Sequence, residues 1–208
     1  MKMIEKILPN TETKIRILSI IYENPEINLS KLIKKAKTSP NIALKYVNNL
    51  TKFDILKEKR FGGKKKTHIR NLNADLSSEL SVLIFSFVEM EKKLIFLEKY
   101  KEIKPFASQL TELCGEKTDF CLIYGSFARA AADKDSDLDV WLVGNADAEM
   151  KKRISEIFST FKREYSIKIE TSKQFLKNIK NPIHQNILRE HIVIYNEIGF
   201  LKAIKEVQ

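Results

Sequence analysis

The chain has 208 residues, of which 43% are hydrophobic and 31% charged, and its formal net charge at pH 7 is +10. This length allows one large domain or two small ones, and the hydrophobic share is enough for a buried core. Its apolar runs fall short of the roughly 18–20 residues that a membrane span needs. Charges at Glu5 and Lys6 are not typical of a signal peptide. We therefore expect a cytoplasmic protein without a membrane partner.

The net positive charge lies entirely in the first third of the chain. Residues 1–72 contain 17 Lys and Arg against 6 Asp and Glu, whereas residues 73–208 contain 20 against 21. A basic module joined to a nearly neutral one indicates that the first module meets a polyanion such as nucleic acid. A general lysine bias in the composition is the alternative. Cys114 and Cys121 have no CxxC spacing, and we expect reduced thiols in a core.

Residues 11–72 predict three helices followed by a hairpin. Apolar spacing favours helices over 11–23, from Asn28 onward and over 40–52, where Ser39 is a candidate N-cap and Pro40 suits the first helical position. Alternating residues on both sides of Gly62-Gly63 then predict a hairpin. The outward face of the third helix offers polar side chains, and the hairpin tip is basic.

This order of elements resembles a winged helix-turn-helix domain. The resemblance implies that the third helix enters the major groove of duplex DNA and the hairpin tip contacts phosphates or the minor groove. The candidate nucleic-acid-binding residues are Asn41, Lys45, Asn48, Asn49, Arg60, Lys64, Lys65 and Lys66. The alternative is a solvated polar face in a domain that binds protein.

A long helix is predicted from about Leu76 to Tyr100. It is apolar on more than one side. We therefore interpret this helix as a spacer, as the seam of a homodimer or as a helix that packs between two domains. A further helix is expected over 105–115. We divide the chain into a winged-helix domain at 1–73, a helical linker at 74–104 and a second domain at 105–208.

The second domain opens with two strands around a polar loop. Residues 119–124 predict a strand that ends at Gly125-Ser126, and residues 138–143 predict another that begins after Asp137. Asp137 and Asp139 point the same way because strand side chains alternate. Two such carboxylates repel each other unless a cation lies between them, and oxygen ligands suit Mg²⁺. Gly125 lets the backbone approach a ligand closely, and the helix that follows favours phosphate.

The run from Gly125-Ser126 to Asp137-x-Asp139, with ten residues between Ser126 and Asp137, resembles the signature of the DNA polymerase β-like nucleotidyltransferase superfamily. Gly-Ser-x-Ala-Arg followed by Ser-Asp-x-Asp is similar to its minimal nucleotidyltransferase branch. That branch often has Gly where this chain has Ala130. The similarity covers roughly residues 105–200. It implies a mixed sheet flanked by helices, and therefore an α+β chain overall.

The resemblance also implies roles. Asp137 and Asp139 would hold Mg²⁺, and Gly125 and Ser126 would hold the phosphates of a nucleoside triphosphate, most plausibly ATP. Arg129 would pair with a phosphate or an aspartate, or form a structural ion pair.

A third carboxylate normally comes from a later strand. Over 165–170 the only acid is Glu170, and Lys168 sits where an acid is expected. Either Glu170 completes the catalytic site or the site has two acids.

The remaining pattern predicts a helix at 147–162, short helices at 172–179 and 182–190, a strand near 191–195 and a terminal helix. Three functions remain open. The first is a Mg²⁺-dependent nucleotidyltransferase with a DNA-binding domain. The second is a DNA-binding transcription regulator whose nucleotidyltransferase fold only senses a nucleotide or is inactive. The third is an enzyme that modifies RNA or tRNA.

Overall fold

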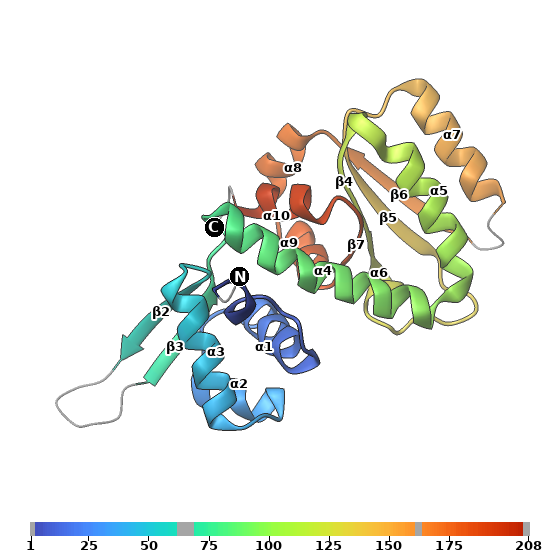
Figure 1. Cartoon of the computed structure of the whole chain (residues 1–208). Helices are drawn as coiled ribbons and strands as arrows, with labels where there is room; N and C mark the ends of the chain where they lie inside the picture. Colours follow the sequence, from blue (N-terminus) through green and yellow to red (C-terminus); the bar gives the residue numbers. More distant parts are fainter. Residues whose placement is uncertain (1–2, 62–68, 161–163, 206–208) are drawn as a thin grey trace. The chain divides into compact units, whose positions relative to one another are not determined.

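The computed structural model describes residues 3–61, 69–160 and 164–205 of the chain. The chain falls into two compact units, Met1–Val88 and Glu89–Gln208. The division lies inside the long helix α4, Glu79–Lys99 (Figure 1). This helix corresponds to the one predicted from about Leu76 to Tyr100. None of the helices in the described ranges is both long enough and apolar enough to cross a membrane.

The first unit contains the predicted helices and hairpin strands. Helices α1 (Glu12–Glu23), α2 (Leu29–Ala36) and α3 (Pro40–Lys52) are capped by Thr11, Asn28 and Ser39, whose side chains accept hydrogen bonds from backbone N–H groups. Strands β2 (Leu56–Phe61) and β3 (Ile69–Ala74) pair antiparallel, in register from Leu56 opposite Ala74 to Phe61 opposite Ile69. The prediction did not include η1 (Ile4–Lys6) or the two-residue strand β1 (Ile27–Asn28), which are too short to show periodicity.

The apolar faces of these elements form the core of the first unit. Strand β1 adds to the far side of β3, which gives the sheet order β1-β3-β2. Tyr46 of α3 is also buried, and its hydroxyl donates to the carbonyl of Ile7 at 2.9 Å. The buried apolar residues of the helices are Ile17, Leu18, Ile21, Leu32, Ala36, Ala43, Val47 and Leu50.

The second unit is built around a four-stranded mixed sheet. Its strands are β4 (Thr118–Tyr124), β5 (Leu138–Gly144), β6 (Tyr165–Glu170) and β7 (Ile192–Tyr195), in the order β6-β5-β4-β7. Strand β4 runs antiparallel to both β5 and β7, whereas β5 and β6 are parallel. The helices are α5 (Lys104–Cys114), α6 (Gly125–Ala128), α7 (Ala148–Ser159), α8 (Ser172–Asn178), α9 (Pro182–Arg189) and α10 (Glu197–Lys205), with short 3-10 turns η2 (Lys101–Ile103) and η3 (Gly115–Lys117).

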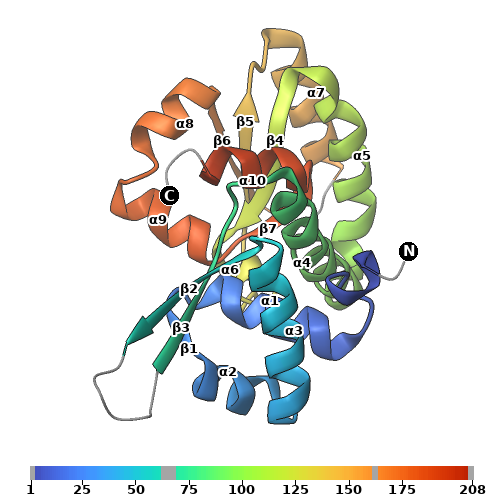
Figure 2. The same cartoon turned by 60° about the vertical axis from the view of Figure 1, so that its left-hand side comes forward.

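Helices cover both faces of this sheet. In Figure 2, α5 and α7 lie on one side of β4, β5 and β6, and α8 and α9 lie on the other. Strand residues alternate between the two faces. Val140 and Leu142 join the core under α5 and α7, together with the buried free cysteines Cys114 and Cys121. Trp141 faces the other layer, where its ring meets that of Phe175 of α8. Asp139 precedes Trp141 by two positions, so it belongs to the α8–α9 face.

Candidate active site

Gly125 packs directly against Asp139. Strand β4 ends opposite the start of β5, with Tyr124 paired to Asp139. Gly125 follows with φ +72°, and a Cβ atom built on it would overlap the Asp139 carboxylate, since it would lie 3.1 Å from Asp139 Cγ. Only glycine adopts this backbone conformation at low cost and leaves room for the carboxylate. The Gly-Ser step therefore holds the backbone directly against the acidic pair.

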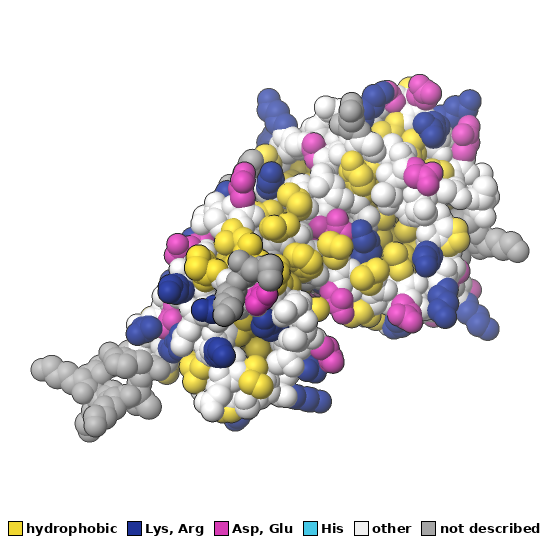
Figure 3. Space-filling model, in the orientation of Figure 1, with side chains coloured by type: hydrophobic (Ala, Val, Ile, Leu, Met, Phe, Trp, Pro, Cys, Tyr) yellow, Lys and Arg dark blue, Asp and Glu magenta, His cyan; other side chains and the backbone are white. Residues whose placement is uncertain are grey.

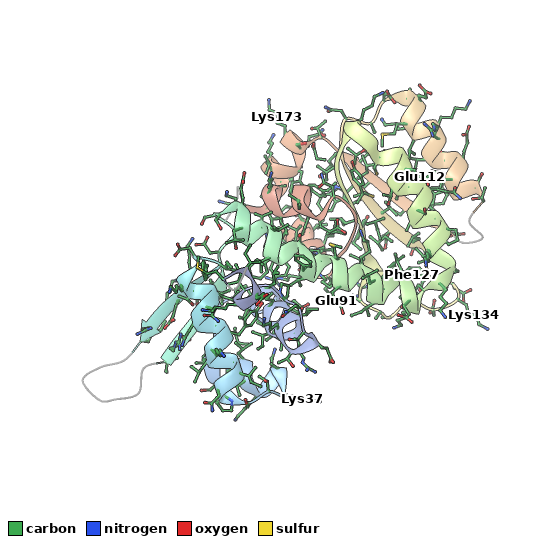
Figure 4. The ribbon with its side chains drawn as sticks, in the orientation of Figure 1. Lys37, Glu91, Glu112, Phe127, Lys134 and Lys173 are labelled. Atoms are coloured by element: carbon green, nitrogen blue, oxygen red, sulfur yellow. The ribbon has the colours of Figure 1, made fainter. Side chains whose placement is uncertain are left out.

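Ser126 and Phe127 lie in α6, a single helical turn that follows Gly125. Phe127, labelled in Figure 4, is buried in the core of the second unit and anchors the turn. The Ser126 hydroxyl oxygen is shielded from solvent and has no hydrogen-bond partner among the described residues. A buried hydroxyl without a partner is costly in a folded protein. Ser126 is therefore a group that a bound polar ligand would satisfy.

Asp137 and Asp139 lie on either side of the buried Leu138. Asp137 is exposed and Asp139 is partly buried. Burial raises the pKa of Asp139, and the negative charge of Asp137 raises it further. The positive charge of Arg129 and a hydrogen bond from Ser166 oppose this shift. A divalent cation between the two carboxylates would relieve both the burial and the repulsion, so this donor set fits Mg²⁺.

Ser166 stands where a third carboxylate would complete the site. In the parallel pairing of β5 with β6, Asp139 lies opposite Ser166. The Ser166 hydroxyl hydrogen-bonds with Asp139 and with Tyr124 of β4. Burial raises the pKa of Tyr124, and the charge of Asp139 adds to that rise. Among the described residues there is no cluster of three or more His, Cys, Asp and Glu side chains arranged to bind a metal.

The structure does not bring Glu170 to this cluster. Glu170 lies opposite Val143, four residues beyond Ser166 and so about 13 Å further along the strand. Its carboxylate contacts Lys168 Nζ and His184 Nε2, each at 3.1 Å. The residue opposite Asp139 is Ser166, not Lys168, which lies opposite Trp141 with its ammonium 4.0 Å from a ring centroid. The sequence did not reveal this register because two-residue shifts preserve the alternation.

Arg129 lies between the acidic pair and a second acid. Its charge acts on Asp139, and its Nη1 atom is 3.7 Å from Oε2 of Glu190. Glu190 caps α9 just before β7, and nothing in the sequence pattern marked it as part of the site. Both side chains are about half exposed. Ala130 has a φ of +56°, a left-handed conformation that favours glycine. This explains why a glycine suits the position after the arginine.

The predicted nucleic-acid-binding residues of α3 share one face of the helix. Asn41, Lys45 and Asn48 are exposed, and Asn49 is partly buried. The side-chain oxygen of Asn48 accepts a hydrogen bond of 2.9 Å from Arg70 Nη2. Arg70 comes from β3, so the fold adds to this face a cation that the sequence did not connect with it.

Arg60 on β2 is exposed and pairs with Glu58. Glu58 also accepts two hydrogen bonds from the Arg70 guanidinium, at 2.8 and 2.7 Å. The hydrogen bond from Arg70 is the main reason why the pKa of Glu58 is lowered. Arg70 is thus held in place beside α3. The predicted tip residues Lys64, Lys65 and Lys66 lie outside the described residues.

Comparison with known proteins bears on the second unit. Residues 101–198 match the family model described as "Polymerase beta, Nucleotidyltransferase". A protein of Methanocaldococcus jannaschii named "Putative protein adenylyltransferase" is 26% identical over 103 residues, which cover 48% of this chain and 100% of the relative. Residues 101–198, which contain the Gly125, Ser126, Asp137 and Asp139 cluster, are therefore similar to nucleotidyltransferases. Both matches support nucleotidyl transfer as the activity of this region.

Proposed function

We propose that this chain transfers AMP from ATP to an acceptor hydroxyl and that its N-terminal unit binds nucleic acid. The observation that carries the first part is the packing of Gly125 and Ser126 against the Asp137–Asp139 pair inside the region that is similar to nucleotidyltransferases. The acceptor oxygen attacks the α-phosphorus of the triphosphate, the bond to the bridging oxygen breaks, and pyrophosphate leaves.

Each residue of the cluster has a part in this reaction. The Ser126 hydroxyl, buried and without a partner among the described residues, donates to the β- or γ-phosphate. Gly125 brings the backbone close to the triphosphate. When ATP binds, Arg129 leaves its ion pair with Glu190. Its positive charge then lies beside the departing pyrophosphate. One carboxylate of the Asp137–Asp139 pair accepts the proton that the acceptor hydroxyl loses.

Asp137 and Asp139 would also hold Mg²⁺. The ion supplies positive charge to the phosphoryl oxygens and lowers the repulsion between the nucleotide and the two carboxylates. Because Ser166 is neutral, the described residues contribute two negative charges here, those of Asp137 and Asp139. The nucleotide phosphates must provide the remaining anionic ligands, so we expect the metal to bind with the nucleotide rather than before it.

The name of the relative from Methanocaldococcus jannaschii suggests the acceptor. A protein adenylyltransferase moves AMP to a protein, and on this analogy we propose a protein hydroxyl as the acceptor of the present chain. The match covers 103 residues, which is 48% of this chain, so it gives no support for a role of the whole chain in this choice.

A second function is favoured by Ser166. With a hydroxyl in place of the third acid, the domain could bind a nucleotide and transfer nothing. The chain would then be a DNA-binding regulator that senses the nucleotide. Loss of turnover with retained binding is the behaviour that this function predicts.

The order of elements in the N-terminal unit supports the proposal that this unit is a winged helix-turn-helix domain. Three helices and a β-hairpin come in the order of that domain, and α3 exposes Asn41, Lys45 and Asn48. Such a helix reads bases in the major groove of duplex DNA. RNA is the competing ligand, and a preference for structured RNA over duplex DNA would favour a role in RNA or tRNA modification.

The test is calorimetric titration of the full chain with Mg²⁺ and ATP, followed by a pyrophosphate assay on the same samples with protein extract as acceptor. The Asp137→Asn/Asp139→Asn and Ser126→Ala variants are measured beside the wild type. Binding that the variants lose, together with pyrophosphate release by the wild type, supports the enzyme. Binding without release supports the sensing regulator. Wild-type protein that binds no nucleoside triphosphate overturns both functions.

A further inference from the structure

Arg70 of β3 connects the hairpin to the exposed face of α3. Its guanidinium donates two hydrogen bonds to Glu58, from Nε at 2.8 Å and from Nη2 at 2.7 Å. Nη2 also donates to Oδ1 of Asn48 at 2.9 Å. The Glu58 side chain is 6% exposed and that of Arg70 is 17% exposed, whereas Asn48 lies at the surface of α3. A nearly buried carboxylate therefore holds the arginine that contacts Asn48.

The strand pairing of the hairpin brings these side chains together. Arg60 of β2 lies directly opposite Arg70 of β3, and Glu58 precedes Arg60 by two positions. Opposite residues of an antiparallel pair, and residues two apart on one strand, point to the same face of a sheet. Figure 1 draws α3 beside β2 and β3. The hydrogen bond from Arg70 to Asn48 crosses from this face of the sheet to α3.

These hydrogen bonds set the orientation of the Asn48 amide. Two N–H···O bonds to one carboxylate fix the plane of a guanidinium as well as its position. Arginine has no acceptor atom, so the carbonyl oxygen of Asn48 must be the atom that faces it. The N–H groups of Asn48 Nδ2 are then turned away from Arg70, and no described residue accepts a hydrogen bond from them. These N–H groups are therefore available to an acceptor outside the protein.

The charge of Arg70 is matched within the protein. The hydrogen bond from Arg70 is the main reason why the pKa of Glu58 is lowered, so this carboxylate is ionised at neutral pH. Arg60, whose side chain is 67% exposed, shares the same carboxylate. Figure 3 shows further Lys and Arg side chains on the surface of the first unit. Exposed cations of this kind suit phosphates, whereas the less exposed Arg70 holds a neighbouring side chain.

We propose that Arg70 positions Asn48 to donate its amide N–H groups to N7 of a purine in the major groove of duplex DNA. This inference rests on the proposed function of the N-terminal unit, and it adds the base atom that is read and the residue that orients the reading side chain. N7 is a major-groove acceptor of both purines. A flipped amide would present its oxygen and accept from the amino group of cytosine, so a fixed orientation excludes that base.

Duplex DNA with 7-deazapurines tests the proposal, because these bases carry a C–H group in place of N7. Selection from a randomised duplex pool with the full chain gives a preferred sequence, and each of its purines is then replaced in turn. At one position the replacement should weaken wild-type binding by about tenfold, the effect of one lost base contact. Asn48→Ala should bind the natural and the modified duplex equally well.

Arg70→Lys separates positioning from charge. Lysine keeps the ion pair with Glu58 but lacks the planar fork that holds both the carboxylate and the Asn48 amide. We expect it to reduce the preference for N7 from about tenfold to below about threefold, with an unchanged slope of log affinity against log salt. In the Asn48→Ala background the same substitution should not change the preference further. Circular dichroism checks that each variant keeps its fold.

The matched control is Lys59→Arg, which also exchanges one hairpin cation for another. Lys59 pairs with Glu26 at 3.0 Å and points to the opposite face of β2 from Glu58, so the variant should keep the full preference for N7. An Arg70→Lys variant that keeps the full preference overturns the positioning role. A wild type whose DNA affinity depends on salt but on no purine N7 overturns the role of Asn48, and DNA binding stands. A wild type that binds no duplex DNA overturns both the inference and DNA binding by the N-terminal unit.

Discussion

Ser166 lies opposite Asp139 in the parallel pairing of β5 and β6 and hydrogen-bonds to its carboxylate. The position that faces the acidic pair on the neighbouring strand is thus neutral in this chain. Among the described residues, two carboxylates, and no cluster of three, are placed to hold a cation. The residue at this position bears on the choice between the proposed enzyme and the sensing regulator, and mutation of Ser166 can test it.

Ser166→Asp is expected to create a tighter metal site. A third carboxylate beside Asp139 adds ligand charge, so half-saturation with Mg²⁺ should need about tenfold less metal. Without metal, repulsion should lower the free energy of unfolding by about 1–3 kcal/mol. Thermal melting with and without Mg²⁺ measures both effects. Ser166→Asn is the neutral control and should show no new dependence on Mg²⁺. If the melting temperature of Ser166→Asp does not change with Mg²⁺, this result would contradict a metal site at Asp137 and Asp139.

Gly125→Ala should abolish nucleotide binding. The new Cβ overlaps the Asp139 side chain, and φ +72° is strained for alanine, so we expect a loss of about 1–3 kcal/mol in stability as well. The control is Gly115→Ala, where φ is +41° but a Cβ meets no atom within 4 Å. It carries the backbone strain without the overlap and should keep nucleotide binding. Calorimetry with Mg²⁺ and ATP decides, and equal binding by wild type and Gly125→Ala would remove Gly125 from the site.

Ala130→Gly should stabilise the second unit. Ala130 has a φ of +56°, which costs about 1–2 kcal/mol for an L-residue, and glycine avoids that cost against a smaller loss of chain entropy. We expect a gain of about 0.5–1 kcal/mol in urea unfolding. Ala128→Gly, two residues earlier and within α6, should have the opposite sign. If both substitutions destabilise the protein, then glycine at position 130 relieves no backbone strain.

The buried pair of Glu89 and His191 should make stability depend on pH in acid. His191 Nε2 is 3.2 Å from Glu89 Oε1, and Lys92 Nζ is 3.3 Å from the other oxygen. Burial alone would raise the pKa of Glu89, but the charge and hydrogen bond of His191, with Lys92, lower it to about 2. A carboxyl with a depressed folded-state pKa stabilises the fold above its unfolded pKa. That stability is lost as the pH falls from about 4.5 toward 2.

Glu89→Gln removes this contribution and leaves His191 without its anionic partner. We expect it to lower the free energy of unfolding by about 3–5 kcal/mol at neutral pH. The difference from the wild type should shrink between pH 4.5 and 2, as measured by urea unfolding. Glu112→Gln, an exposed carboxylate on α5 that Figure 4 labels, is the control and should change stability by less than about 0.5 kcal/mol. A difference that stays constant down to pH 2 would contradict the low pKa.

Lys45→Ala should reduce both the affinity for duplex DNA and its salt dependence. If Lys45 neutralises one phosphate, the slope of log affinity against log salt should fall by about 0.9. Asn48→Ala should weaken binding to a preferred sequence and leave the slope unchanged, because a base contact releases no counterion. Lys173→Ala, an exposed lysine of α8 labelled in Figure 4, is the control. A flat salt dependence for the wild type would argue against DNA binding by this chain.

Much of the fold follows from local pattern. Ser39-Pro40 marks the start of α3, and the apolar runs before Gly125 and after Asp137 coincide with β4 and β5. The spacing of Asp137 and Asp139 also showed that both carboxylates share one face, since side-chain alternation is local. These features need only neighbours along the chain, and for that reason sequence alone indicated them.

The tertiary structure decided which residues of neighbouring strands lie opposite one another. Register placed Ser166 beside Asp139 and carried Glu170 to the other end of β6, where it contacts His184. Glu190 is distant from Arg129 in the sequence, and the fold brings the two side chains together. The sequence by itself determined the longer helices and strands and the acidic pair. The partners of that pair depend on strand order and register, which are set by how whole faces pack together and not by any one stretch of residues.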